Sequence, residues 1–495
     1  MTQEDQTIDT LIHKYEGSWQ AGYAAFPERV CKLGLRIGVE VGVAFGGHAR
    51  AILEQRGVDK LYGVDSYQHR DDYDDPMNLP QAVFDRLAKR VVDRLSIFQD
   101  RFEQIREDSV TASRRFEDGS LDFVYLDADH SEAGLIADLC AWFPKVREGG
   151  IIAGHDLDHP DFPGVSNAIH RFFSRFGWQP EALGHGVWTI TKQARPVTFF
   201  TPAYNAAPFL AEAARSLIEN NMRPGDEYII VDDASTDDTA AIVSRIAAMD
   251  ERVTILRHTE NKGGGAARNT ALAQANAQLF FCLDADNVLL PGSVDRLRDE
   301  MDRHASEVVC FGRVDYFRDE PTADAVTHSH EYAHSEYSLA EYVTTCRVPG
   351  SSGNYLFARS NYDAAGGYPT SSGALDTWGF GLRQVANGGT MLTVPGTSYL
   401  HRDGHSSYWT RYAKSNAIDE HAFELIEPFL DQLDPRDAAR LRSKRRRKDW
   451  FKRIGDRPLR TRPAAPQTMS TNLTITTLPR TITKAFSRLL NRAAA

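Results

Sequence analysis

A chain of 495 residues is longer than a single hydrophobic core usually supports, which predicts two or three domains. Its 42% apolar and 25% charged residues are typical of a soluble globular protein, and no apolar run is long enough for a membrane-spanning helix. The five cysteines form no CxxC pair, and the polar, acidic start MTQEDQTIDT is unlike a signal peptide. We therefore expect a cytoplasmic protein with reduced thiols and no structural zinc.

The net charge of -11 conceals two regions of opposite sign. Residues 440–495 contain 16 Lys and Arg against 2 Asp and Glu, so this tail carries +14 and the rest of the chain -25. An acidic body with a basic tail indicates a soluble enzyme with a separate surface-binding segment. Nucleic acid is a poor partner for this chain, because the acidic body repels phosphates.

In the first part of the chain, after a polar helical start, short apolar segments alternate with segments of helical periodicity. The expected strands are LRIGVEVGV, KLYGVDSY, LSIFQD, LDFVYLDAD and GIIAGHD, with GVWTITK at the edge of the sheet. This alternation predicts a doubly wound α/β domain over residues 1–193, followed by a linker at QARP.

A second α/β pattern begins at Val197 and is expected to extend over residues 197–432. Its strands are VTFFTPAYN, YIIVDDAS, VTILRHT and QLFFCLDAD, and its motifs differ from those of the first domain, so the chain is not an internal repeat. Residues 433–495 are expected to form a basic, partly disordered tail.

Glycines and a carboxylate follow the first two strands of the first domain. Gly42, Gly46 and Gly47 form a turn after one strand, and Asp65 ends the next. Glycines let the backbone approach a ligand and a carboxylate can accept ribose hydroxyls, which favours an adenosine-type site. Ala44 replaces the middle glycine of the dinucleotide pattern, which argues against NAD. A tight turn without a ligand is the alternative.

The later strands of this domain end in LDADHSE and GHDLDHP, and the whole set resembles class I S-adenosylmethionine-dependent methyltransferases. The resemblance implies that this cofactor contacts Glu40, Gly42, Gly46 and Asp65. In metal-dependent relatives, the carboxylates that match Asp127 and Asp156 hold Mg²⁺. His130 or His155 is then the candidate base, and His155 stands where some relatives carry a further acidic ligand. A domain that keeps only the fold is the alternative. The residues that the resemblance assigns are Glu40, Gly42, Gly46, Asp65, Asp127, His130, His155 and Asp156.

Polar residues also follow the first strands of the second domain, in TPAYN and VDDASTDDT. Ligands of open α/β sheets bind beyond the carboxyl ends of the strands, where Asp232 can accept hydrogen bonds from a base or ribose. Helix capping is the simpler explanation of the same residues. In NKGGGAARNTAL, the glycines permit close backbone approach, and Arg268 lies near a helix start, where phosphates are favoured.

Two further motifs contain carboxylates suited to catalysis. Asp284 and Asp286 of LDADN point the same way in an extended chain and repel each other unless a cation joins them. Their hard oxygens suit Mg²⁺ or Mn²⁺ bridging to a diphosphate, although a solvated turn is the alternative. Asp376 of LDTWGFGLR is a candidate general base, or a helix cap before core residues Trp378 and Phe380.

In this order the motifs resemble family 2 glycosyltransferases of GT-A fold, which use a nucleotide-sugar donor. The resemblance implies that Arg268 lies near the phosphates, that Asp376 is the base of a single inverting displacement, and that Leu375 departs from the usual acidic residue. His401 matches a late histidine that completes the metal site, with His405 as a rival. The implied nucleoside pocket contains Thr201, Tyr204 and Asp232, and the implied metal and ribose site contains Asp284, Asp286 and His401.

The tail combines SKRRRKDWFKR with ITKAFSRLLNR, a segment of amphipathic pattern. These features favour peripheral attachment to the inner face of a membrane, where a lipid-linked glycan acceptor would lie. A disordered solubilising end is an equal alternative.

We therefore predict a bifunctional enzyme of surface-polysaccharide biosynthesis that transfers a sugar and O-methylates a glycan or sugar. One competing hypothesis makes the first domain a non-catalytic module that binds acceptor or partner. Another makes the chain a scaffold with two decayed sites.

Overall fold

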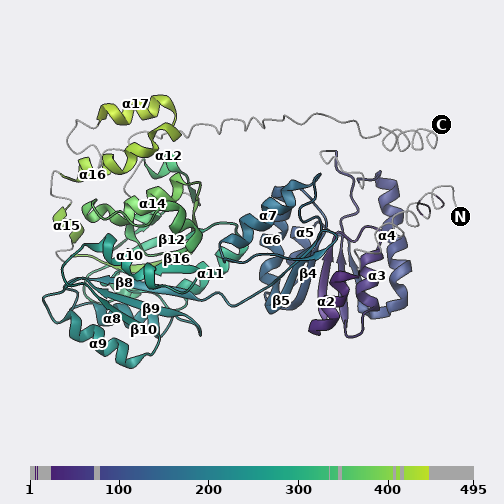
Figure 1. Ribbon diagram of the computed structural model, residues 1–495, viewed down its shortest axis with the longest axis horizontal. Coiled ribbons are helices and arrows are strands. Elements are labelled where there is room, and N and C mark those ends of the chain that lie inside the picture. Colours follow the sequence, from purple (N-terminus) through teal and green to yellow (C-terminus); the bar gives the residue numbers. More distant parts are fainter. Residues whose placement is uncertain are drawn as a thin grey trace.

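A computed structural model describes residues 24–71, 78–333, 335–343, 348–404, 408–412 and 417–444, with Gln6, Ile8 and Thr10. These residues form two α/β domains side by side, the first in purple and blue and the second in teal to yellow (Figure 1). None of the helices within these ranges is long and apolar enough to cross a bilayer. The expected membrane-binding segments lie beyond Lys444, outside the described residues.

The first domain contains a seven-stranded sheet in the order β3-β2-β1-β4-β5-β7-β6, parallel except for β7 and β6. Apolar residues of α2, α3 and α4 pack on one face, and those of α5, α6 and α7 on the other, which confirms the doubly wound, Rossmann-like layout. The elements are β1 (Ile37–Val41), β2 (Lys60–Val64), β3 (Phe102–Ile105), β4 (Leu121–Leu126), β5 (Val146–Gly154), β6 (Glu181–Gly184), β7 (Val187–Thr191), α2 (Ala25–Leu33), α3 (Gly47–Glu54), α4 (Gln81–Leu95), α5 (Ser109–Ser113), α6 (Glu132–Trp142) and α7 (Pro163–Ser174).

Two predicted strands of this domain differ from the structure. Most of LSIFQD lies in a 3-10 helix, η1 (Ser96–Arg101), in which Gln99 has a left-handed φ of 55° and turns the chain into β3. GVWTITK forms β7, but β7 is not an edge strand, because the short, largely exposed strand β6 pairs along its outer side.

The second domain contains a larger sheet in the order β10-β9-β8-β11-β15-β12-β16-β14, with β13 paired to β12. The strands β10, β9, β8 and β11 are parallel, as predicted. Helices α8, α9 and α11 contribute to one apolar layer, and α10, α14 and α16 to the other. The strands are β8 (Val197–Ala203), β9 (Glu227–Asp232), β10 (Val253–Arg257), β11 (Leu279–Cys282), β12 (Val308–Phe317), β13 (His328–Glu331), β14 (Glu336–Tyr337), β15 (Tyr355–Ala358) and β16 (Met391–Arg402).

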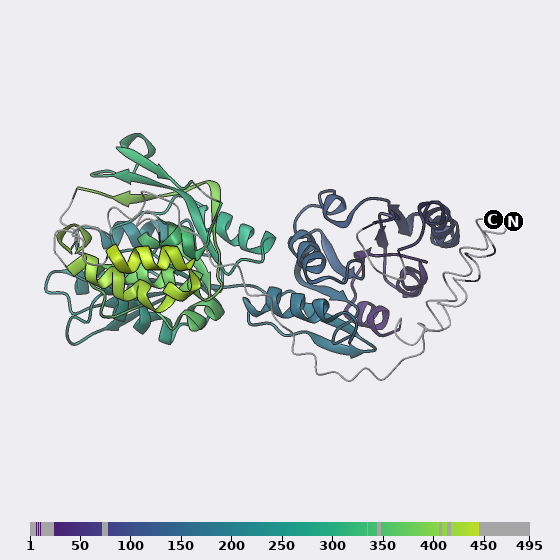
Figure 2. The same cartoon turned by 90° about the horizontal axis from the view of Figure 1, so that it is seen from above.

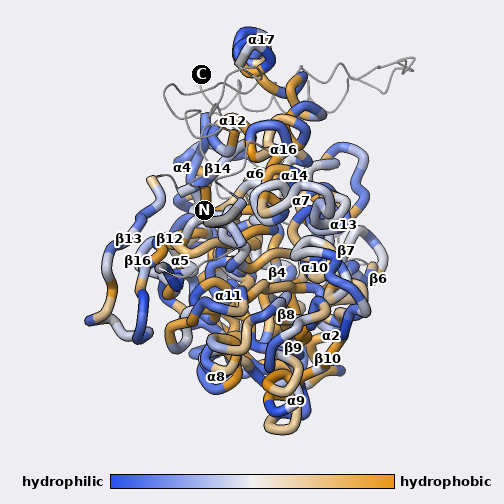
Figure 3. Tube along the Cα trace, turned by 90° about the vertical axis from the view of Figure 1, so that its left-hand side faces the viewer, coloured by the Kyte–Doolittle hydropathy of each residue, from blue (hydrophilic) through white to orange (hydrophobic). Residues whose placement is uncertain are grey.

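The helical segments of this domain extend past the expected start of the tail. In α17, Ala438 and Leu441 are buried, although the outer surface of this helix is hydrophilic (Figure 3). Packed structure therefore continues to residue 444, beyond the predicted boundary at 432. The helices are α8 (Leu210–Ile218), α9 (Thr239–Met249), α10 (Gly264–Gln274), α11 (Ser293–Arg303), α12 (Leu339–Tyr342), α13 (Arg359–Ala365), α14 (Asp376–Ala386), α15 (Tyr408–Tyr412), α16 (Ala417–Ile426) and α17 (Pro435–Lys444), with 3-10 turns η2 (Phe143–Lys145), η3 (Ala323–Ala325), η4 (Pro349–Ser352), η5 (Gly373–Leu375) and η6 (Glu427–Gln432).

The domains remain distinct bodies when seen from above (Figure 2), and the C-terminal end of α11 contacts α6 and η2 of the first domain. Arg175, which is 1% exposed, stacks its guanidinium on Phe172 and Phe176 at 3.9 and 4.7 Å. It donates a hydrogen bond to the carbonyl of His304, just past α11. Cations are favoured there by the helix dipole.

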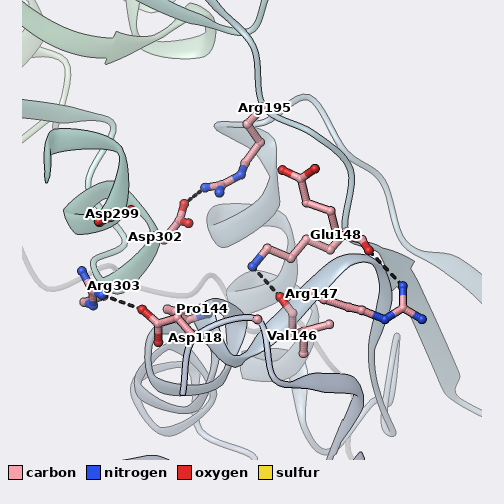
Figure 4. A pocket seen from close by; sticks show the side chains of 11 residues that line it. Asp118, Pro144, Val146, Arg147, Glu148, Arg195, Asp299, Asp302 and Arg303 are labelled. Carbon is pink, nitrogen blue, oxygen red and sulfur yellow. Dashed lines mark hydrogen bonds and ion pairs between the residues drawn. The ribbon is translucent and has the colours of Figure 1, made fainter. Parts of the chain in front are cut away.

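Further ion pairs surround a small pocket at this interface (Figure 4). Arg303 pairs with Asp118 at 2.6 Å, and Arg195 of the linker pairs with Asp302. Lys192 donates to two main-chain carbonyls at 2.7 and 2.9 Å, and burial lowers the pKa of its amine to about 7. The interface thus combines charged side chains of both domains with the buried amine of Lys192.

A buried ion pair fixes α11 to the start of the second sheet. Asp226 accepts from both terminal nitrogens of Arg298, at 2.6 and 3.2 Å, and from the amide of Val197 at 2.8 Å. The side chains of Asp226 and Arg298 are 0% and 4% exposed. One carboxylate therefore holds the first residue of β8 and the helix that contacts the other domain.

We expect Asp226→Ala to lower the free energy of unfolding of the second domain by about 3–5 kcal/mol, because it leaves a buried guanidinium without its partner. Urea unfolding measures this change. The control is Arg215→Ala, which breaks an exposed pair with Glu219 at 3.9 Å and should cost at most about 1 kcal/mol. Similar losses for the two variants would contradict the role of Asp226.

Candidate active sites

The carboxyl ends of β9, β8 and β11 meet at one edge of the second sheet. Asp232 ends β9, is 1% exposed and accepts from the amide of Ser235 at 2.9 Å. Tyr204 follows β8 and is 48% exposed. Both residues are therefore placed where a nucleoside was expected.

Thr201 differs from this expectation. Its side chain is fully buried, and its hydroxyl donates to the carbonyl of Leu283 at 2.7 Å and lies 2.8 Å from the Tyr228 hydroxyl. The side chain ties β8 to the end of β11. It therefore supports the site from beneath and does not line it.

Asp233 is a site residue that the motif analysis missed. Its carboxylate accepts from the amides of Lys262 and Gly263 at 2.9 and 2.8 Å and lies 2.6 Å from Nδ1 of His258. It thereby holds the glycine-rich loop against the end of β9. The second carboxylate of the motif VDDAS was the feature of the sequence from which Asp233 could have been identified.

The glycines of this loop are required by packing. A Cβ at Gly264 would lie 2.6 Å from Oδ2 of Asp376, and one at Gly265 would overlap the carbonyl of Pro369. The first turn of α10 therefore lies against the start of α14. This packing contact is a second reason for the glycines, beside the expected close approach to a ligand.

Arg268 of α10 joins two of the predicted functional carboxylates. Its Nη1 donates to Asp376 at 2.7 Å and its Nη2 to Asp284 at 2.8 Å, and the guanidinium is largely buried. The structure thus brings together the glycine loop, the DAD motif and the candidate base. Trp378 and Phe380 lie in the core, as the simpler explanation of that motif held.

Asn354 is a second residue that sequence reasoning missed. Its Oδ1 accepts from the amide of Asp284 at 3.0 Å, and its Nδ2 donates to Asp284 Oδ2 at 3.1 Å. Burial raises the pKa of Asp284 to about 6, a shift that Arg268 opposes and the charge of Asp286 increases. The site thus combines three carboxylates, Asp284, Asp286 and Asp376, with the guanidinium of Arg268.

His401 lies near the end of β16, next to Tyr316 at 5.1 Å between ring centroids. The following residue, Arg402, donates from its amide to Asn287 at 3.2 Å and from Nε to the carbonyl of Asp286 at 3.3 Å. These bonds attach β16 to the DAD turn. Asp284, Asp286 and His401 nevertheless do not form a compact ligand group in the described part of the chain, and His405 lies outside it.

The first domain contains such a group, at the carboxyl ends of β4 and β5. Ligand atoms of Asp127, His130 and Asp156 all lie within 4.8 Å of one another. His130 Nε2 is 3.0 Å from Asp156 and 3.4 Å from Asp127, and its ring stacks on Phe162 at 4.4 Å. Two carboxylates and an imidazole suit Mg²⁺ or Mn²⁺.

Asp156 is held between two histidines. His155 Nδ1 lies 3.0 Å from Asp156, and Asp156 adopts a left-handed φ of 62°. Although burial opposes the shift, His130 and His155 hold the pKa of Asp156 below its ordinary value. The pKa of His155 is raised by the same pairing, also against burial. Backbone strain of this kind is typical of functional sites.

The predicted cofactor residues lie on the neighbouring strands, but their side chains are engaged within the protein. Asp65 accepts from the amides of Ala44 and Tyr67 at 3.0 and 2.8 Å. Glu40, 2% exposed, lies 2.9 Å from Nδ1 of His48, and burial raises its pKa. Glu40 therefore faces α3, contrary to the expectation of a cofactor contact.

The two glycines of this turn have left-handed φ values, 90° at Gly42 and 73° at Gly46. A Cβ on Gly42 would overlap the carbonyl of Asp127. The glycine therefore lets the turn after β1 lie against the residue that ends β4. Gly46 precedes the first residue of α3 as its N-cap.

We expect the full chain, without nucleotide, to bind Mn²⁺ through the first-domain group. Asp156→Asn should weaken binding at least about tenfold, because it removes a charged ligand from a preformed set. Electron paramagnetic resonance of free Mn²⁺ measures the change. Asp158→Asn, two residues away, is the matched control, and equal binding by wild type and Asp156→Asn would exclude this site.

Comparison with known proteins assigns a family to each domain. The sequence model described as glycosyl transferase family 2 matches residues 198–362, and one described as a methyltransferase domain matches residues 35–157. The succinoglycan biosynthesis protein ExoU of Rhizobium meliloti is 32% identical over 136 residues, or 25% of this chain and 39% of that protein. Glycosyltransferase GlyG of Streptococcus pneumoniae is 28% identical over 121 residues, or 24% and 40%.

Among solved structures, the mannosyltransferase PcManGT of Pyrobaculum calidifontis, in complex with GDP-Man and Mn²⁺, is 22% identical. It covers 53% of this chain and 73% of that one, with a TM-score of 0.37. The chain spans about two fifths of the length of the two curated relatives, 39% and 40%. The matched family models show a methyltransferase domain within the first α/β domain and a family 2 glycosyltransferase domain within the second.

Proposed function

We propose that the second domain transfers a sugar from a nucleotide-sugar donor to a hydroxyl of a glycan acceptor, with inversion. The observation that carries this proposal is the pair of bonds from Arg268 to Asp284 and Asp376. These bonds join Asp284, the predicted donor-binding carboxylate, and Asp376, the predicted base, in one largely buried site. Family 2 membership supports the same reaction.

In this proposal, Asp376 accepts the proton of the acceptor hydroxyl. The acceptor oxygen forms the new bond to the anomeric carbon as the bond to the diphosphate breaks on the opposite face. Asp376 lies at the first turn of α14, where the helix dipole favours a carboxylate. Arg268 holds its Oδ2 and the amide of Thr377 its Oδ1, at 2.7 and 2.9 Å, so the carboxylate has a defined orientation.

The charge of the site fits a divalent cation. Asp284 and Asp376 share the single guanidinium of Arg268, and the nearby charge of Asp286 acts on Asp284 as well, so carboxylates outnumber the guanidinium at this point. Asp284 and Asp286 would hold Mn²⁺ or Mg²⁺, with His401 as a candidate third ligand. When bound, the ion would supply charge neutralisation for the leaving diphosphate.

We propose that the first domain O-methylates a glycan or sugar, with S-adenosylmethionine as methyl donor. Asp127 and Asp156 would hold the metal, whose chemistry is to orient and acidify the acceptor hydroxyl. His155 is the more available base, because His130 already lies between both carboxylates.

One observation favours the competing hypothesis of a non-catalytic first domain. Asp65 already accepts from two main-chain amides, and one oxygen of Glu40 lies beside His48, so a bound cofactor would share these carboxylates with partners in the protein. Binding of S-adenosylmethionine decides between the two.

The polysaccharide context, the lipid-linked acceptor and the inner membrane face also belong to this proposal. Relatives named for succinoglycan biosynthesis support the first of these. The tail residues on which membrane contact depends lie outside the described residues.

For the second domain, we expect release of nucleoside diphosphate from a panel of UDP-glucose, UDP-N-acetylglucosamine and GDP-mannose in the presence of Mn²⁺. EDTA, or joint replacement of Asp284 and Asp286 by Ala, should abolish it. Activity that persists at the wild-type rate in both tests would refute the metal assignment.

Asp376→Asn should keep the fold and bind nucleotide, yet lose about 10²- to 10⁴-fold in kcat, because an amide cannot accept the proton. Asp403→Asn is the matched comparison, since Asp403 lies just past β16. A large loss in Asp403→Asn, together with normal turnover in Asp376→Asn, would assign the base to Asp403.

For the first domain, calorimetry of the full chain should show S-adenosylmethionine binding that Asp65→Ala weakens about tenfold or more. Thermal unfolding of the variant separates lost affinity from a distorted turn. No heat of binding to the folded wild-type chain would reject the methyltransferase proposal and favour the non-catalytic module.

A further inference from the structure

Among the residues that the structure describes, few aromatic side chains are exposed, and these lie in the second domain. Within the described ranges, the exposed ones are Tyr204, Tyr408 and Trp409, at 48%, 55% and 41%. Tyr204 lies at the candidate donor site. Tyr408 and Trp409 are neighbours on the short helix α15, and no function described above explains them. Exposed aromatic groups of this kind mark binding surfaces.

The helix that carries them is anchored beside the candidate base. Tyr412, the last residue of α15, donates its hydroxyl hydrogen to the carbonyl of Ser372 at 3.2 Å and stacks on His421 at 5.9 Å. A Cβ on Gly373 would overlap the Tyr412 ring, so the two pack in direct contact. Gly373 begins η5, which ends at the residue before Asp376.

The exposed rings are therefore connected, through Tyr412 and η5, to the segment that leads into Asp376. Tyr408 and Tyr412 are four residues apart on one side of α15, with their rings 6.1 Å apart. Trp409 is the next residue after Tyr408 along the helix, and both side chains are exposed. A ligand that packs on these rings would lie on the part of the surface that adjoins this segment.

We propose that Tyr408 and Trp409 form the acceptor subsite and pack against the apolar face of a pyranose ring. This inference rests on the proposed glycosyl transfer and adds where the acceptor binds. A sugar ring presents C–H groups on its faces and hydroxyls on its edge. Flat Tyr and Trp rings match that pattern, because they offer an apolar face with a polar atom at the edge.

A single sugar ring suits this surface better than a membrane does. Helix α15 has five residues, whereas membrane-binding helices present a long apolar face. The acidic residues Asp419 and Glu420 begin the adjoining helix α16, and they disfavour anionic lipid headgroups.

Saturation-transfer NMR on the full chain with UDP and Mn²⁺ tests the subsite. The probes are the methyl β-pyranosides of glucose, galactose and N-acetylglucosamine. We expect transfer to the ring protons of at least one probe, and a dissociation constant raised about three- to tenfold by Trp409→Ala. Trp409→Phe should retain most of the affinity, because it keeps an aromatic face.

Met249→Ala is the matched control, since Met249 is 79% exposed on α9 and lies outside both candidate sites. Thermal unfolding shows whether each variant is folded. The inference is overturned if no probe binds the wild type, or if Trp409→Ala and Tyr408→Ala bind as the wild type does. It is also overturned if Trp409→Ala instead abolishes binding to vesicles of phosphatidylglycerol.

Separate titrations with UDP and with GDP, each with Mn²⁺, distinguish the two proposals. If the wild type binds neither nucleotide, the donor site itself is wrong and the subsite falls with it. If a nucleotide binds but replacement of Tyr408 and Trp409 leaves the affinity for the pyranosides unchanged, only the acceptor subsite is wrong.

Discussion

The organisation of the second domain depends on one buried guanidinium. Arg268 bonds to Asp284 after β11 and to Asp376 at the start of α14, and both bonds are shorter than 3 Å. Two carboxylates cannot be buried side by side without a counter-charge, because desolvation and repulsion both oppose it. Gly264 and Gly265 permit this contact, since any side chain there would separate α10 from α14. The glycine run, the arginine and the two carboxylates are therefore a single structural unit.

The sequence predicted well those features that depend on local pattern. Strand alternation located β1, β2, β4, β5 and β7 of the first sheet and the parallel strands β8 to β11 of the second, but not β12 to β16. Carboxylates that follow these apolar strands lie together at one edge of each sheet, because parallel strands end together. The failure at LSIFQD came from a backbone turn at Gln99, which hydrophobic pattern does not reveal. The position of GVWTITK was wrong because β6 has four residues and none of them is β-branched or aromatic, so that it gives a weak strand signal.

Side-chain partners were harder to predict, because tertiary packing decides them. Arg268 was expected near phosphates from its place near a helix start, and its bond to Asp376, 108 residues away, has no local signal. Thr201 and Glu40 lie on the strands that their motifs predicted. Their side chains nevertheless turn into the core, toward Leu283 and His48. In both cases the motif located the strand end, while the direction of the side chain depended on the neighbouring element.

The two candidate sites balance their carboxylates in different ways. In the second domain a permanent cation, Arg268, is shared by Asp284 and Asp376. In the first domain the carboxylates of Asp127 and Asp156 instead lie beside the imidazole of His130, at 3.4 and 3.0 Å. A guanidinium is charged at any physiological pH and has no acceptor atom, whereas a neutral imidazole has one and is a common metal ligand. The second domain therefore holds its two carboxylates with a fixed counter-charge, and the first domain holds its two with a group that can itself be a ligand.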